Sequence, residues 1–234
     1  MEHNDTSLKK TARLAGLLYL VWIIMGMYGM LYVSPKIMVK GDVVATANNM
    51  LANEFLFRTS LITDLIGSAI WVFMALVFYR LLKQVNEHQA KLLVALVIVQ
   101  IPVVFIAEAF SITSLMILKG EILKTFDLSQ RQDIAMLFLK INDYGVMALE
   151  MFWGFWLFPL AILVYRSNFL PRFLGVWLVI CGLAYLILSF TVLLLPQYNS
   201  TVFYLSIPAF LGELAFMLWL LIMGVKNTTV ISEA

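Results

Sequence analysis

The chain contains few of the residues that build disulfides and transition-metal centres. Its 234 residues include one cysteine, Cys181, and two histidines, His3 and His88. A single cysteine permits neither an intramolecular disulfide nor a cysteine metal cluster. Both histidines lie near the expected ends of hydrophobic segments, which excludes a His-rich zinc site. The formal charge of +2 is too small to indicate a nucleic-acid partner.

Sequence motifs of known catalytic sites are also missing. The chain has no Gly-x-Ser-x-Gly, no Walker lysine loop, no His-Glu-x-x-His and no Cys-x-x-Cys. Paired carboxylates can hydrolyse glycosidic bonds or, with a metal, phosphoesters, but nothing in this sequence selects either reaction. The sequence therefore names no reaction and no catalytic residue.

Charged residues are scarce, and long hydrophobic runs take their place. Charged residues make up 13% of the chain and hydrophobic residues 62%, with a mean hydropathy of +0.93. A soluble domain is nearer to half apolar and a quarter charged. We therefore predict an integral membrane protein that forms a single domain over residues 1–234. The first apolar run is about 20 residues long, which suits a spanning helix better than a removable signal peptide.

Six segments have the length and hydrophobicity of membrane-spanning helices. The predicted fold is therefore all-α, an integral-membrane six-helix bundle. Pro102 is expected to kink the third helix, and Pro208 to interrupt the outer turn of the sixth. The predicted spans cover residues 12–33, 55–82, 90–118, 144–165, 173–195 and 202–225.

Two outer loops have the pattern of short amphipathic helices. Residues 42–54 carry an apolar face and begin with Asp42 as the N-cap, and residues 129–141 do the same with Ser129 as the N-cap. We expect both helices to lie on the outer membrane surface. The alternative is that they cover a cavity that opens outward.

The distribution of basic residues sets the expected orientation. With the N-terminus inside, the cytoplasmic segments hold nine Lys and Arg residues and the outer segments hold seven, which is a weak bias. The short loops at residues 80–83 and 165–172 give the clearer signal, because each carries two basic residues. We therefore place both termini in the cytoplasm.

Four carboxylates inside the predicted spans give the strongest indication of function. They are Asp64, Glu108, Glu150 and Glu213, they come from four different helices, and no Lys, Arg or His lies at the same depth. A charged residue in the bilayer core costs several kcal/mol, so such residues usually mark ion paths, proton relays or ligand sites. With the orientation above, all four lie in the outer half of the membrane.

The helix faces around these carboxylates carry further polar residues, which indicates that the faces point into the bundle. Tyr19, Tyr28 and Tyr185 could supply hydroxyl groups to the same interior, and Arg58 and Lys140 could act as gating partners at the outer rim. The candidate ligand-binding residues are Asp64, Glu108, Glu150, Glu213, Arg58, Ser60, Ser68 and Tyr144.

Adjacent carboxylates in a low dielectric cannot all ionise, which leaves three chemical states open. In the first, the acids are protonated and hydrogen-bonded to Ser and Tyr, with a purely structural role. In the second, the four carboxylates hold a metal ion, and oxygen ligands alone suit Ca²⁺, Mg²⁺ or Mn²⁺. In the third, the cluster carries protons or captures an organic cation.

Several stretches of the sequence match the pattern of a known protein family. They are Ala12–Tyr19, Gly41–Arg58 with Asp64, Asn142–Gly145, and Phe169–Gly175 with Gly182 and Tyr185. On these stretches the chain resembles, over about residues 9–225, the bacterial membrane proteins grouped as domain of unknown function 4386. The resemblance implies a multi-pass protein of the bacterial plasma membrane. It implies no activity.

Three functions are consistent with these observations. The first, which we favour, is binding or transport of a cation or small cationic ligand through an outward-facing cluster of intramembrane carboxylates. The second is a metal-dependent intramembrane enzyme that acts on lipid or an envelope precursor. The third is a non-catalytic membrane partner or regulator. Homo-oligomerisation is an open possibility, because single chains of six helices often dimerise to form a path.

Overall fold

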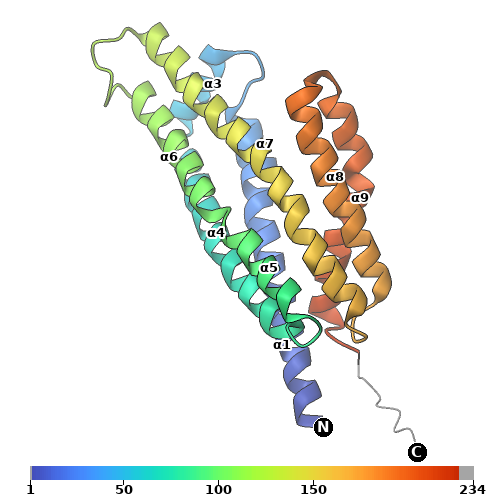
Figure 1. The fold of residues 1–234 in the computed structure, drawn as a ribbon. Coiled ribbons are helices and arrows are strands. Elements are labelled where there is room, and N and C mark those ends of the chain that lie inside the picture. Colours follow the sequence, from blue (N-terminus) through green and yellow to red (C-terminus); the bar gives the residue numbers. More distant parts are fainter. Residues whose placement is uncertain (1, 227–234) are drawn as a thin grey trace, which may run out of the picture. The chain divides into compact units, whose positions relative to one another are not determined.

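The computed structural model describes residues 2–226, and within them it contains helices and no strand (Figure 1). The elements follow from apolar runs punctuated by polar loops. In chain order they are α1 (Glu2–Met27), a π-helical segment (Tyr28–Val33), α2 (Ser34–Ile37), α3 (Val43–Ala52), α4 (Glu54–Leu82), α5 (Glu87–Ile98), α6 (Ile101–Leu118), α7 (Leu128–Arg166), α8 (Arg172–Leu194), a 3₁₀ turn (Pro196–Tyr198) and α9 (Asn199–Ile222).

Six helical segments of the described chain are long and apolar enough to cross a membrane. Each is longer than the roughly 20 residues that a bilayer core requires, so the prediction of an all-α protein with six spanning helices is confirmed. The segments are Ser7–Ile37, Glu54–Leu82, Glu87–Leu118, Leu128–Arg166, Arg172–Leu194 and Pro196–Ile222.

The two predicted proline effects have different outcomes. The third span is interrupted at residues 99–100, directly before Pro102, which occupies the first turn of α6. Proline lacks an N–H and fits the first turn of a helix well. The third span is therefore interrupted where α6 begins with Pro102 in its first turn. Pro208, in contrast, lies inside α9, and the helix continues through it. The prediction that Pro208 interrupts the outer turn is therefore wrong.

The two amphipathic segments also differ. The first is a separate helix, α3, and its N-cap is Asp42, whose Oδ1 accepts a hydrogen bond of 2.8 Å from the Ala45 N–H. The second is not separate, because α7 runs without a break from Leu128 to Arg166 (Figure 1). The cap is Asp127 rather than Ser129: Asp127 accepts from the Gln130 N–H at 2.9 Å, and Gln130 Oε1 accepts from the Asp127 N–H at 3.0 Å.

The described chain divides into two compact units, which we call unit 1 and unit 2. Unit 1 comprises residues 2–20, 71–99 and 149–226, and unit 2 comprises residues 21–70 and 100–148. The helices α1, α4 and α7 each contribute residues to both units.

Unit 1 is packed through aromatic rings and glycines. The Tyr19 ring lies 6.1 Å from the Phe78 ring and 6.1 Å from the Trp156 ring, and the α8 and α9 helices lie side by side. A Cβ at Gly16 would lie 2.6 Å from the backbone nitrogen of Leu221, so α1 and α9 touch backbone to backbone there. Small residues at such crossings are typical of helix packing in membranes.

Unit 2 has an aliphatic core that includes the apolar face of α3. Ala47 and Met50 of α3 are both fully buried. The face of α3 that the sequence assigned to the membrane surface is therefore packed against protein. The core residues are Val33, Ile37, Ala47, Met50, Phe57, Leu61, Leu115, Ile117, Leu118, Ala135 and Leu139.

Candidate functional site

Two of the predicted carboxylates interact electrostatically within unit 2. Asp64 of α4 and Glu108 of α6 are both partly buried and lie close enough to interact electrostatically. Glu108 also interacts with the Ser111 side chain, and its buried Oε2 has no hydrogen-bond partner. Among the residues that the structure describes, no ion pair involves either carboxylate. We call these two residues the Asp64–Glu108 pair.

A polar network lies on the turn of α6 that carries Glu108. The Asn142 side-chain amide of α7 donates to the Ala107 carbonyl at 2.9 Å and to Ser111 Oγ at 2.8 Å. Ser111 Oγ in turn donates to the Ala107 carbonyl at 3.4 Å. Asn142 therefore joins α7 to the turn of α6 that carries Glu108. The sequence analysis did not select Asn142 for this role, although it is a polar residue inside a predominantly apolar helix.

The π-helical segment lies beside Asp64. A Cβ built on Gly29 would be 3.8 Å from both carboxylate oxygens of Asp64, so the backbone of this segment comes close to that carboxyl group. Tyr28, in the same segment, shares a hydrogen bond of 2.8 Å with Thr59 of α4. Local π-helical turns often occur at functional sites. Here the turn places Gly29 next to the Asp64 carboxylate.

The other predicted ligand residues of unit 2 have different partners. The hydroxyls of Ser60 and Ser68 donate to their own helix, at Phe57 O (2.8 Å) and Asp64 O (2.9 Å). Serine on a spanning helix commonly satisfies its hydroxyl in this way. The Tyr144 side chain is 60% exposed in the isolated chain. These positions do not add a group to the Asp64–Glu108 pair.

Arg58 belongs to an ion-pair network at one end of unit 2. Glu54 Oε1 lies 2.8 Å from Arg58 Nε and 3.0 Å from Lys119 Nζ, and Lys119 also pairs with Glu121 at 3.0 Å. The hydrogen bonds from Lys119 to Glu121 and Glu54 raise the pKa of the Lys119 ammonium. Arg58 thus pairs with Glu54 and not with Asp64.

Glu213 lies in unit 1, in a fully formed hydrogen-bond shell. Its carboxyl is 7% exposed and accepts hydrogen bonds from the Tyr19 hydroxyl and, at 3.5 Å, from the Cys181 thiol. The Tyr185 hydroxyl also interacts with this carboxyl. The sequence indicated that Tyr19 and Tyr185 provide hydroxyls in the interior. It gave no indication that Cys181 does the same, because only the three-dimensional packing of α8 on α9 brings the thiol to the carboxyl.

Glu150 is the second carboxylate of unit 1. It is partly buried, interacts electrostatically with Tyr185, and its buried Oε2 has no hydrogen-bond partner. Asp64 and Glu108 thus interact within unit 2, and Glu150 and Glu213 both interact with Tyr185 within unit 1. The outward-facing cluster of all four carboxylates stays a prediction.

The structure allows a direct test of the metal-ligand geometry. Within the described residues, no three side chains of His, Cys, Asp or Glu are close enough together to hold a metal ion. A cation at the Asp64–Glu108 pair would therefore have at most two carboxylate ligands. The hydroxyl, amide and backbone groups nearby would have to complete its coordination.

Comparison with known proteins identifies relatives of unassigned function. The model of a family described as "Domain of unknown function (DUF4386)" matches residues 14–224. An "Uncharacterized protein" of Archaeoglobus fulgidus is 33% identical over 95 residues, which are 41% of this chain and 53% of that protein. The chain thus spans about half the length of this relative. No solved structure matches the chain.

Proposed function

We propose a function from the residues of this chain, because it belongs to the family described as Domain of unknown function (DUF4386), a description that assigns no activity. The proposed function is binding of a cation or small cationic molecule at the Asp64–Glu108 pair. Its six span-length helices make it a multi-pass membrane protein. The pair lies within two of these spans, so transport of the bound cation is the activity that such a site would serve.

The observation that supports the proposal is the electrostatic interaction between two carboxylates that have no basic partner among the described residues. Both lie in spans, where an uncompensated charge is costly. Two carboxylates that interact electrostatically repel one another when both are ionised, and a cation between them removes the repulsion. The free Oε2 of Glu108 is an acceptor available to such a cation.

The groups around the pair favour a cation of low charge or a protonated amine over a tightly coordinated divalent metal. Dedicated Ca²⁺ sites use six to eight oxygen ligands, several of them carboxylates, whereas the described residues offer no group of three acidic or imidazole ligands. The same observation removes support for a metal-dependent enzyme. Glu213, already held by the Tyr19 hydroxyl and the Cys181 thiol, is better suited to a structural role.

The basic residues support an orientation with both termini in the cytoplasm, and with it a location in the plasma membrane. Arg166 and Arg172 flank the short turn between α7 and α8, Arg80 lies in the last turn of α4, and Lys83 begins the turn between α4 and α5. Basic residues in short loops are enriched on the cytoplasmic side.

A thermal-stability titration tests the proposal. The detergent-purified chain is titrated with Na⁺, Ca²⁺ and methylammonium chlorides, with ionic strength held by N-methylglucamine chloride. A bound cation stabilises the folded state in a saturable way. We expect saturable stabilisation by Na⁺ or methylammonium rather than by Ca²⁺, retained in Asp143→Asn and lost in Asp64→Asn/Glu108→Gln. Asp143 is an exposed acid on α7 of the same unit, and a shift of equal size in both variants would contradict the proposal.

A further inference from the structure

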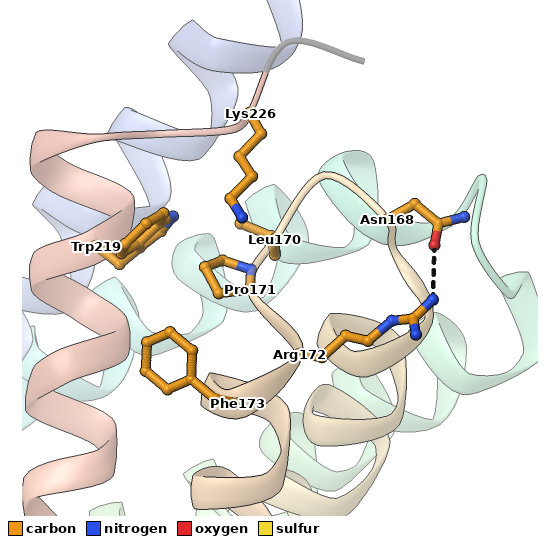
Figure 2. Close-up of a pocket in the computed structure, with 7 residues that line it drawn as sticks. All are labelled: Asn168, Leu170, Pro171, Arg172, Phe173, Trp219 and Lys226. Carbon is orange, nitrogen blue, oxygen red and sulfur yellow. Dashed lines mark hydrogen bonds between the residues drawn. The ribbon is translucent and has the colours of Figure 1, made fainter. Parts of the chain in front are cut away.

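A basic pocket lies in unit 1, where the turn between α7 and α8 meets the end of α9. Its volume is about 420 Å³. Figure 2 shows its walls, with the Lys226 side chain extending toward Leu170 and Pro171. The lining residues are Asn168, Leu170, Pro171, Arg172, Phe173, Trp219 and Lys226.

Backbone hydrogen bonds hold the pocket in shape. The Lys226 N–H donates to the Phe169 carbonyl at 2.9 Å, which fastens the segment after α9 to the α7–α8 turn. The Leu170 N–H donates to Ser167 Oγ at 3.1 Å inside that turn. Gly224, at a φ of +71°, ends α9 in the left-handed conformation that glycine adopts without strain. These contacts within the chain hold the α7–α8 turn against the segment after α9.

Two cations line this pocket, and neither has a carboxylate partner. The Arg172 guanidinium donates to Asn168 Oδ1 at 3.4 Å and lies 5.7 Å from the centre of the Tyr165 ring. Among residues whose side chains the structure describes, neither Arg172 nor Lys226 forms an ion pair. Lys226 extends toward Leu170 and Pro171, whereas Arg172 extends toward Asn168 (Figure 2). A pocket lined by two like charges favours a bound anion, and arginine in particular forms strong charge-assisted hydrogen bonds with phosphate.

Further basic groups lie near the same end of α9. Arg13 Nη2 donates to the Ile222 carbonyl at 3.2 Å, and Lys9 lies against Gly224, where its Cγ would be 2.9 Å from an added Cβ. These side chains raise the positive potential close to Lys226, within the same unit.

The remaining walls of the pocket are apolar. The Trp219 and Phe173 rings pack edge to face with their centres 6.4 Å apart, and Leu170 and Pro171 form the wall next to Lys226. The pocket lies between the start of α8 and the end of α9, both of which are span-length helices. Tryptophan is typical of the membrane–water interface, and basic pockets between helices on the cytoplasmic side bind acidic lipid headgroups.

We propose that this pocket binds a phosphate-bearing anion, and that its apolar wall selects the headgroup of an acidic phospholipid. Arg172 and Lys226 neutralise the phosphate, and Trp219 and Phe173 contact the adjoining glycerol and upper acyl chain. This site is independent of the cation proposed for the Asp64–Glu108 pair, because it uses none of the same residues.

Lipid binding to the detergent-purified chain tests the proposal. The probes are phosphatidylglycerol, phosphatidylcholine and soluble glycerol 3-phosphate, with affinity followed by native mass spectrometry and thermal stability. We expect phosphatidylglycerol to bind more tightly than phosphatidylcholine, and Arg172→Gln/Lys226→Gln to weaken phosphatidylglycerol binding by about tenfold. Arg80→Gln/Lys83→Gln, which removes the same charge elsewhere in unit 1, should change it by less than about twofold.

The outcomes separate the alternatives. An equal loss in both double variants, or equal binding of the two lipids, would overturn the proposal, because surface charge or detergent-like binding would then explain the data. If glycerol 3-phosphate bound tightly and displaced the lipid, the site would still bind phosphate. The proposal that the phosphate belongs to a phospholipid would then be overturned. Restored binding in Arg172→Lys/Lys226→Arg would show that charge, and not a folding defect, caused the loss.

Discussion

At the scale of single residues, the intramembrane carboxylates differ in how they are satisfied. Glu213 is held by hydroxyl and thiol donors from α1 and α8. Glu108 and Glu150 each retain a buried oxygen without a partner. Buried polar groups in native proteins are almost always paired, so an unpaired one calls for a specific explanation. A buried carboxyl group whose oxygens have hydrogen-bond partners suits a structural role, whereas one with an unpaired oxygen suits ligand binding.

Replacing Glu213 should therefore cost more stability than replacing Glu150. Glu213→Gln places an amide NH₂, itself a donor, next to the Tyr19 and Cys181 donors. We therefore expect a loss of about 1–3 kcal/mol in the free energy of unfolding. Glu150→Gln removes a charge that has no ion-pair partner among the described residues, so the loss should be smaller than about 1 kcal/mol. Unfolding in mixed micelles measures both. If Glu150→Gln proved as destabilising as Glu213→Gln, the distinction would fail.

Some residues of the candidate sites could be predicted from the sequence, and others could not. The hydrophobic context alone selected Asp64, Glu108, Glu150 and Glu213, and the same context indicated Tyr19 and Tyr185 as interior hydroxyls. Cys181, Gly29 and Asn142 could not be assigned, because helical periodicity places a residue on a face of its own helix and does not say which neighbouring helix covers that face.

At the scale of elements, the six spans were predictable, and the ends of the second and fifth spans agree with the prediction to within one residue. The start of the fourth span was not predicted. The apolar runs determine how many helices cross the membrane. Where α7 begins depends instead on the reciprocal hydrogen bonds between Asp127 and Gln130. Nothing in the sequence from Leu128 to Asp143 breaks a helix, so a segment predicted as a separate surface helix continues directly into the span.

Contacts between helices depend on particular glycines, and two glycines of α1 form a matched pair. In Gly16→Ala the new Cβ would overlap the Leu221 backbone of α9 at 2.6 Å. Backbone atoms cannot yield as a flexible side chain does, so we expect destabilisation of about 1–3 kcal/mol. In Gly26→Ala the Cβ meets nothing within 4 Å, and the higher helix propensity of alanine should stabilise by up to about 1 kcal/mol. Equal effects on the melting temperature would contradict the α1–α9 contact.

At the scale of the whole molecule, the chain is a multi-pass membrane protein whose basic residues favour cytoplasmic termini. Labelling of introduced cysteines by a membrane-impermeant maleimide tests this orientation, because Cys181 is fully buried and should not react. In intact cells we expect Lys124→Cys to be labelled and Lys83→Cys to be labelled only after permeabilisation. Both lysines are exposed on loops. The reverse pattern would invert the orientation.

Equilibrium binding at the Asp64–Glu108 pair tests the central claim most directly. The most stabilising of Na⁺, Ca²⁺ and methylammonium is dialysed to equilibrium against the detergent-purified chain, the Asp143→Asn control and the Asp64→Asn/Glu108→Gln variant. The account predicts one saturable site per chain in the first two and none in the third, with affinity falling at acid pH because protons compete for the same carboxylates. Saturable binding of the same stoichiometry in the double variant would contradict it.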